Sequence, residues 1–133
     1  MVLKKMVLRD NKISAQNITF ALSGILPETT KLALTGVRPS FHYDENRKRT
    51  EIVEGYNYTV TEMETLSSFT VRVNSTTPVI TPEELENSGE RVFVEFPLDE
   101  TVVKPYKLEY GMATVSITAP YVKLATSADY AED

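Results

Sequence analysis

Alternation of apolar and polar residues with a period of two recurs along most of this chain, and it limits the fold to one built mainly from β-strands. The alternation puts successive side chains on opposite faces of an extended strand. It is present in residues 31–41, 51–63, 67–75, 91–98 and 106–124, which are rich in the Val, Thr, Tyr and Phe that strands favour. Residues 17–24 alternate too, as a short strand or the lead-in to the first long one. Five main strands are therefore predicted.

The alternation also predicts which strand residues point into the core and which can form a binding surface. Tyr56 and Tyr58 share a face with Val60, so they are either core residues whose hydroxyls reach the rim or members of a binding surface. Phe93 lies on the face opposite Val94, which predicts an exposed ring unless a helix or the N-terminal arm covers it. Within residues 31–41, a glycine and a proline predict a bulge, a barrel corner or an edge strand.

One short helix is predicted in the stretch TPEELENSG, residues 81–89. Thr81 is a good N-cap, Pro82 suits the first helical position, Glu84 completes a capping box and Gly89 can end the helix. Glutamates in the first turn suit the helix dipole, so the acidic cluster here needs no catalytic explanation.

Three strands, one helix and two strands is the element order of the OB-fold, a partly open five-stranded Greek-key barrel. The sequence therefore predicts an all-β, OB-fold-like domain over residues 17–124, with the helix between strands 3 and 4. A five-stranded sandwich and an SH3-like barrel with an incidental helix are the alternatives. Residues 1–16 are predicted to form an N-terminal arm, and residues 125–133 an acidic, disordered C-terminal tail.

Composition narrows the class of protein. The 133 residues are 41% hydrophobic, enough for one domain with a real core. The chain has no cysteine, and nowhere does it have a signal-peptide core or an apolar run long enough to span a membrane, so a soluble cytoplasmic protein is expected. With a single histidine, no Gly-rich phosphate loop and no metal-ligand spacing, a non-catalytic protein without cofactor or metal is expected.

Charge is divided unevenly along the chain. Residues 1–50 hold nine cations and four anions, whereas the remaining 83 residues hold five cations and fifteen anions, and the net charge is −5. Such asymmetry suggests a basic surface for a polyanion beside an acidic region.

The cations gather with aromatic residues in two predicted loops of the OB-type barrel, the two that grip the ligand in such barrels: YDENRKRTE, residues 43–51, between strands 1 and 2, and LDETVVKPYK, residues 98–107, between strands 4 and 5. Single-stranded nucleic acid suits this mixture, because cations follow the phosphates and rings stack on the bases. Including neighbouring strand positions, the predicted nucleic-acid-binding residues are Arg38, Phe41, Tyr43, Arg47, Lys48, Arg49, Tyr56, Tyr58, Arg72, Phe93, Lys104, Tyr106 and Lys107.

Each of these signals has a plainer interpretation. The cations of the first loop can be only a solvated hairpin tip, partly neutralised by Asp44, Glu45 and Glu51. His42 cannot make a metal site without convergent partners.

By element order and by its NRKR and VVKPYK loops, the chain resembles the small OB-fold single-stranded-DNA-binding proteins, including the accessory ones of the PrgE kind that conjugative plasmids and phages of Gram-positive bacteria carry. The resemblance covers roughly residues 30–120 and implies largely sequence-independent binding of single-stranded DNA or RNA. In bacterial single-strand binders an acidic C-terminal tail recruits partner proteins, and SADYAED is similar in charge. It departs from them in lacking apolar final residues, and the chain lacks Trp.

The N-terminal arm is apolar and basic. It is predicted to pack on a neighbouring protomer and to make binding cooperative, with oligomerisation residues Leu3, Met6, Val7 and Leu8. An extra strand on its own barrel and a disordered segment are the alternatives. Two other functions stay open: a protein-interaction or structural β-domain of a phage or mobile element, and a sugar-binding OB module.

Overall fold

The computed structural model describes residues 8–13 and 18–125, and these residues form a mainly β protein. A separate hairpin consists of β1 (Leu8–Arg9) and β2 (Lys12–Ile13). The main sheet consists of β3 (Phe20–Ala21), β4 (Leu32–Tyr43), β5 (Arg49–Glu62), β6 (Ser68–Val73), β7 (Phe93–Glu95), β8 (Val102–Glu109), β9 (Met112–Ala119) and β10 (Lys123–Ala125). Two short helices, η2 (Leu22–Gly24) and α1 (Pro82–Glu86), accompany the strands. The predicted all-β class is confirmed.

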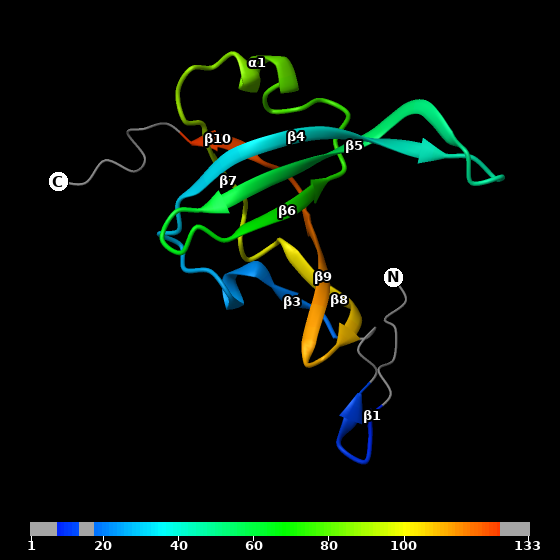
Figure 1. Ribbon diagram of the computed structural model, residues 1–133. Coiled ribbons are helices and arrows are strands. Elements are labelled where there is room, and N and C mark those ends of the chain that lie inside the picture. The colour runs from blue at the N-terminus through cyan, green and yellow to red at the C-terminus, as the bar shows by residue number, and fades with distance from the viewer. Residues whose placement is uncertain (1–7, 14–17, 126–133) are drawn as a thin grey trace.

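The eight strands form one open sheet in the order β10-β7-β4-β5-β6-β9-β8-β3. Strands β4, β5 and β6 follow one another along the chain and pair antiparallel, and β7 then pairs with the other edge of β4. The pairing of β6 with β9 is parallel, with Arg72 opposite Thr118. The sheet is strongly curved, and β8 and β9 lie below the layer formed by β4, β5 and β6 (Figure 1). A short connection, residues 96–101, joins β7 to β8.

Some predicted boundaries were wrong. Residues 106–124 do not form one strand, because Tyr110 and Gly111 have positive φ values of 51° and 78° and turn the chain between β8 and β9. Positive φ at both central residues is the requirement of a tight hairpin turn, which Asn-Gly usually signals and Tyr-Gly does not. The end of the predicted polar connection DETVVKP therefore belongs to β8. Of residues 91–98, predicted as a strand, only the three residues of β7 are in a strand. Residues 8–13, predicted as part of an arm, form the β1–β2 hairpin.

The core lies on the inner face of the curved sheet. Val60, Val71 and Val73 are buried, as the alternation predicted. Leu22, in η2, is also buried, and its backbone N–H donates to the carbonyl of Thr101, so η2 packs onto the connection between β7 and β8. The buried cluster contains Leu22, Leu32, Leu34, Val37, Tyr58, Val60, Val71, Val73, Val94, Phe96, Val103, Ile117 and Ala119.

Helix α1 begins as the sequence predicted. The Thr81 side chain accepts a hydrogen bond from the Glu84 N–H, and the Glu84 carboxylate accepts one from the Thr81 N–H. These bonds lower the pKa of Glu84, because they stabilise its charged form. Half-buried Leu85 packs this single turn against the core. Neither described helix is long or apolar enough to cross a membrane.

Gly55 lies where β5 leaves β6, and the close approach of the two backbones requires a glycine there. A Cβ at this position would lie 2.5 Å from the carbonyl oxygen of Val73 and 2.8 Å from Nε of Arg72. We expect Gly55→Ala to lower the free energy of unfolding by about 2–3 kcal/mol, because the backbone of β6 would have to shift. Urea denaturation measures this. Gly36→Ala is the matched control: a Cβ there would meet Thr59 at 3.5 Å, an ordinary contact, and an equal loss in both variants would contradict the prediction.

Candidate nucleic-acid interface

The most prominent surface feature is a two-stranded ribbon at the end of β4 and the start of β5. Pairing of β5 with β6 begins only at Tyr56, so residues 39–55, here called the β4–β5 ribbon, continue without a third strand among the described residues. Figure 1 shows the ribbon extending well beyond the rest of the sheet. It carries the first of the two predicted loops at its tip, where solvent reaches it from all sides.

Hydrogen bonds within the tip turn its cations outward. The Asp44 carboxylate accepts from the N–H groups of Asn46 and Lys48, and the Asp44 N–H donates to the Lys48 carbonyl. Arg47 takes up a positive φ of 62° to close the turn. The side chains of Arg47, Lys48 and Arg49 are all exposed, and within the described part of the chain no ion pair engages them. The Asp44 carboxylate thus bonds to the backbone of the turn and forms no ion pair with these three side chains.

Two aromatic residues lie next to the last of these cations, Arg49. The Arg49 guanidinium lies 4.6 Å from the centroid of the half-buried Phe41 ring, in cation–π contact. Tyr43 pairs with Arg49 across the ribbon, and 59% of its surface is exposed. The structure therefore brings together the cationic and aromatic residues that the sequence assigned to this loop.

A polar network fixes the base of the ribbon. Arg72 donates from Nη1 to Oγ of Ser40 at 2.8 Å and lies 3.7 Å from the Glu54 carboxylate, which also contacts Nδ1 of His42. Glu54 is the extra residue of a β-bulge opposite Ser40 and Phe41. Arg72 was predicted to bind nucleic acid, but its partners give it a structural role as the clamp between β6 and the ribbon.

The outer face of β4, β5 and β6 continues from the ribbon and is polar. A shallow depression of about 370 Å³ lies over Thr35, Arg38, Asn57, Thr59 and Thr70. The hydroxyls of Thr59 and Thr70 are hydrogen-bonded to each other at 3.1 Å. Arg38 is exposed at the edge of this face nearest the ribbon. Arg38 was among the predicted binding residues and the threonines were not, although their outward positions follow from the same alternation.

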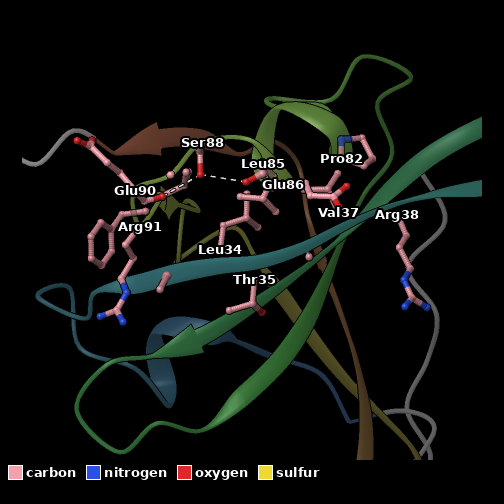
Figure 2. Close-up of a pocket in the computed structure, with 15 residues that line it drawn as sticks. Leu34, Thr35, Val37, Arg38, Pro82, Leu85, Glu86, Ser88, Glu90 and Arg91 are labelled. Atoms are coloured by element: carbon pink, nitrogen blue, oxygen red, sulfur yellow. Dashed lines mark hydrogen bonds between the residues drawn. The ribbon is translucent and has the colours of Figure 1, made fainter.

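A larger groove, about 1070 Å³, runs between α1 and β4. Arg91 and Arg38 lie toward opposite ends of it, with Leu85 and Glu86 above the strand (Figure 2). The half-buried ring of Phe93 contributes to its wall. The groove shares Thr35, Gly36 and Arg38 with the outer-face depression, so the two hollows adjoin at β4. Phe93 thus belongs to the groove, and Arg91 is a further cation there that was not among the predicted binding residues.

Tyr58 does not belong to the surface. It is 1% exposed, and its hydroxyl accepts a hydrogen bond of 3.0 Å from the Val79 N–H. Burial raises the pKa of this phenol, because it removes water from the charged form. Tyr56, on the same face, is half-buried and packs against the core. Of the two interpretations the sequence left open, the core is correct for Tyr58, and its predicted stacking on a base is wrong.

Most of the second predicted loop, residues 98–107, belongs to a strand. Lys104, Tyr106 and Lys107 are on β8, and the β8–β9 hairpin leaves the sheet in a different direction from the β4–β5 ribbon (Figure 1). The cause is the unexpected turn at Tyr110 and Gly111, which places residues 102–109 in a strand. The structure therefore separates these three residues from the cations of the ribbon tip, and the two groups do not form one site.

Other predicted residues fall outside what the structure describes. The described residues do not include Leu3, Met6, Val7 or residues 126–133 of the acidic tail, and of Leu8 they include only the backbone, in β1. In residues 8–13 and 18–125 no group of three His, Asp or Glu side chains is placed to hold a metal ion. Comparison with known proteins gives no match to a family model, a curated protein or a solved structure.

Proposed function

We propose that this chain is a non-catalytic, cytoplasmic protein that binds single-stranded DNA without strong sequence preference, through an OB-type barrel. The β4–β5 ribbon, the outer face of β4 to β6 and the groove beside α1 are the binding surface. The observation that carries the proposal is the exposed ribbon tip, where three successive cations are exposed and the last of them, Arg49, lies over Phe41 and opposite Tyr43.

Strand order supports the proposed barrel. In the sheet, β7 lies beside β4, followed by β5 and β6, which is the spatial order 4-1-2-3 of a Greek key. The β8–β9 hairpin then continues the sheet through the parallel pairing of β9 with β6. In this assignment β7 and β8 together correspond to the fourth strand, interrupted at residues 96–101, β9 is the fifth, and α1 precedes the fourth. The ribbon is then the connection between strands 1 and 2, which contacts the ligand in OB-type domains.

The chemistry of the surface supports a single strand over a duplex. Cations can follow a phosphate backbone of either kind, but Tyr43 can stack only on a base that has no neighbour stacked on that side. The threonine hydroxyls and the Asn57 amide of the outer face can bond to sugars and base edges without selecting one sequence. Because the chain is acidic overall, with a net charge of −5, the basic tip also directs a polyanion to one end of the molecule.

The direct test is a titration of a fluorescently labelled oligo-dT of about 30 nucleotides, longer than the site of one OB-type domain. We expect binding that favours the single strand over a duplex of the same length. We also expect log Kd to change with log salt with a slope of about 0.7 for each phosphate contact, since each contact releases counterions. Absence of binding at low salt would refute the proposal. A Kd that does not change with salt concentration would also contradict it, because a site built to bind a protein or a sugar predicts little salt dependence.

A further inference from the structure

The β8–β9 hairpin, which is the connection between strands 4 and 5 in the proposed barrel, has exposed apolar side chains near its tip that the proposed binding surface does not include. Leu108 is 63% exposed, and the neighbouring Tyr106, Tyr110 and Met112 are also largely exposed. Met112 lies opposite Glu109, so its side chain and that of Leu108 are on opposite faces of the hairpin, and the four side chains surround the tip without forming one patch. Their concentration at one end of the hairpin suits a contact with another molecule.

The outer edge of β8 is open at the same place. On that edge β3 pairs only with Val102 and Val103, and no other described strand reaches Lys107 to Glu109. Glu109 and Met112 flank the two-residue turn, and such flanking residues are a hydrogen-bonded pair. Bonding alternates along antiparallel strands, so the N–H and C=O of Leu108 point away from β9, toward the open edge.

Residues 107–109, Lys-Leu-Glu, are complementary to themselves. In an antiparallel pair centred on a twofold axis at Leu108, the two Leu108 backbones exchange hydrogen bonds, and Lys107 of each copy lies opposite Glu109 of the other. Opposite charges directly across two strands stabilise the pair. The Lys107 ammonium already lies 3.2 Å from Glu109 of its own chain, on the same face of the strand.

From the open edge, this charge pattern and the exposed apolar side chains beside them we propose that two copies of this chain associate through their β8 edges. Pro105 and the β-bulge at Tyr106 end the pairing on one side, and the turn ends it on the other. The contact therefore closes as a dimer and does not extend into a longer sheet. It is smaller than the roughly 1,200 Å² that stable complexes bury, so the dimer is weak.

Sedimentation velocity from about 1 μM to about 1 mM protein, the range of weak complexes, tests this without any nucleic acid, so its outcome is independent of the proposed function. We expect the wild type to pass from monomer to dimer. Lys107→Glu and Glu109→Lys each place two like-charged pairs across the edge and should weaken dimerisation tenfold or more. An equimolar mixture of the two variants should recover it, because both pairs across the edge then join a glutamate to a lysine, although neither chain regains its internal ion pair.

Leu108→Asp should also leave the protein monomeric. Leu66→Asp is the matched control, because Leu66 is 67% exposed but lies in the turn between β5 and β6. A wild type that stays monomeric throughout the range would overturn the proposal. So would a dimer that the charge changes leave intact, a mixture that does not recover, or equal effects of the two leucine changes.

Discussion

Replacement of Arg47, Lys48 and Arg49 together by alanine is expected to weaken binding of oligo-dT about 100-fold at low salt. Each exposed cation that contacts a phosphate contributes on the order of 1 kcal/mol, and the contacts of one turn act on the same stretch of backbone. Loss of Arg49 also removes the cation that lies over Phe41. The measurement is the same fluorescence titration at several salt concentrations, in which the salt slope should fall by about 2.

The matched control removes three positive charges from a part of the molecule away from the ribbon. Lys104, Lys107 and Lys123 are exposed cations on β8 and β10, away from the ribbon. Their triple alanine variant has the same net charge as the ribbon variant, so it corrects for the general effect of charge on a polyanion. If both variants lose affinity equally, the binding surface is not the ribbon. If only the control loses affinity, the site is the β8–β9 hairpin, as the original loop prediction would have it.

Tyr58→Ala is expected to lower the free energy of unfolding by about 4 kcal/mol, close to the whole stability of a marginal domain. The ring is among the largest fully buried side chains of the described core, and its removal leaves a cavity between β5 and its neighbours. The hydrogen bond to the Val79 N–H, which holds the chain after β6 against the sheet, is lost as well. Urea denaturation followed by circular dichroism measures the change.

Tyr58→Phe separates the two contributions. It keeps the ring and removes only the hydroxyl that accepts from Val79, so we expect a loss of about 1–2 kcal/mol. Binding of oligo-dT by this variant should be unchanged under conditions where it is folded, because Tyr58 is buried. A loss of affinity with little loss of stability would mean that Tyr58 contacts the ligand, which contradicts its placement in the core.

The correct predictions rest on patterns between residues close together in the sequence. The capping box at Thr81 and Glu84 needs only residues three apart, so the start of α1 was predicted correctly. Alternation placed Val60, Val71 and Val73 inside, because the two faces of a strand follow from pleating alone. The turn at Tyr110 and Gly111 was missed because its conformation is usual for Asn-Gly, and that error moved Lys104, Tyr106 and Lys107 from a loop into a strand.

Periodicity, capping and the clustering of cations at residues 47–49 determined, from the sequence alone, an all-β chain with one capped helix and a basic hairpin tip. Only the tertiary structure decided that Tyr58 is core, that Arg72 clamps the base of the ribbon and that the two basic segments lie on different hairpins. The reason is that burial and strand pairing depend on contacts between residues distant in sequence: Arg72 meets Ser40 across 32 positions, and Tyr58 meets Val79 across 21. No local pattern encodes such pairs.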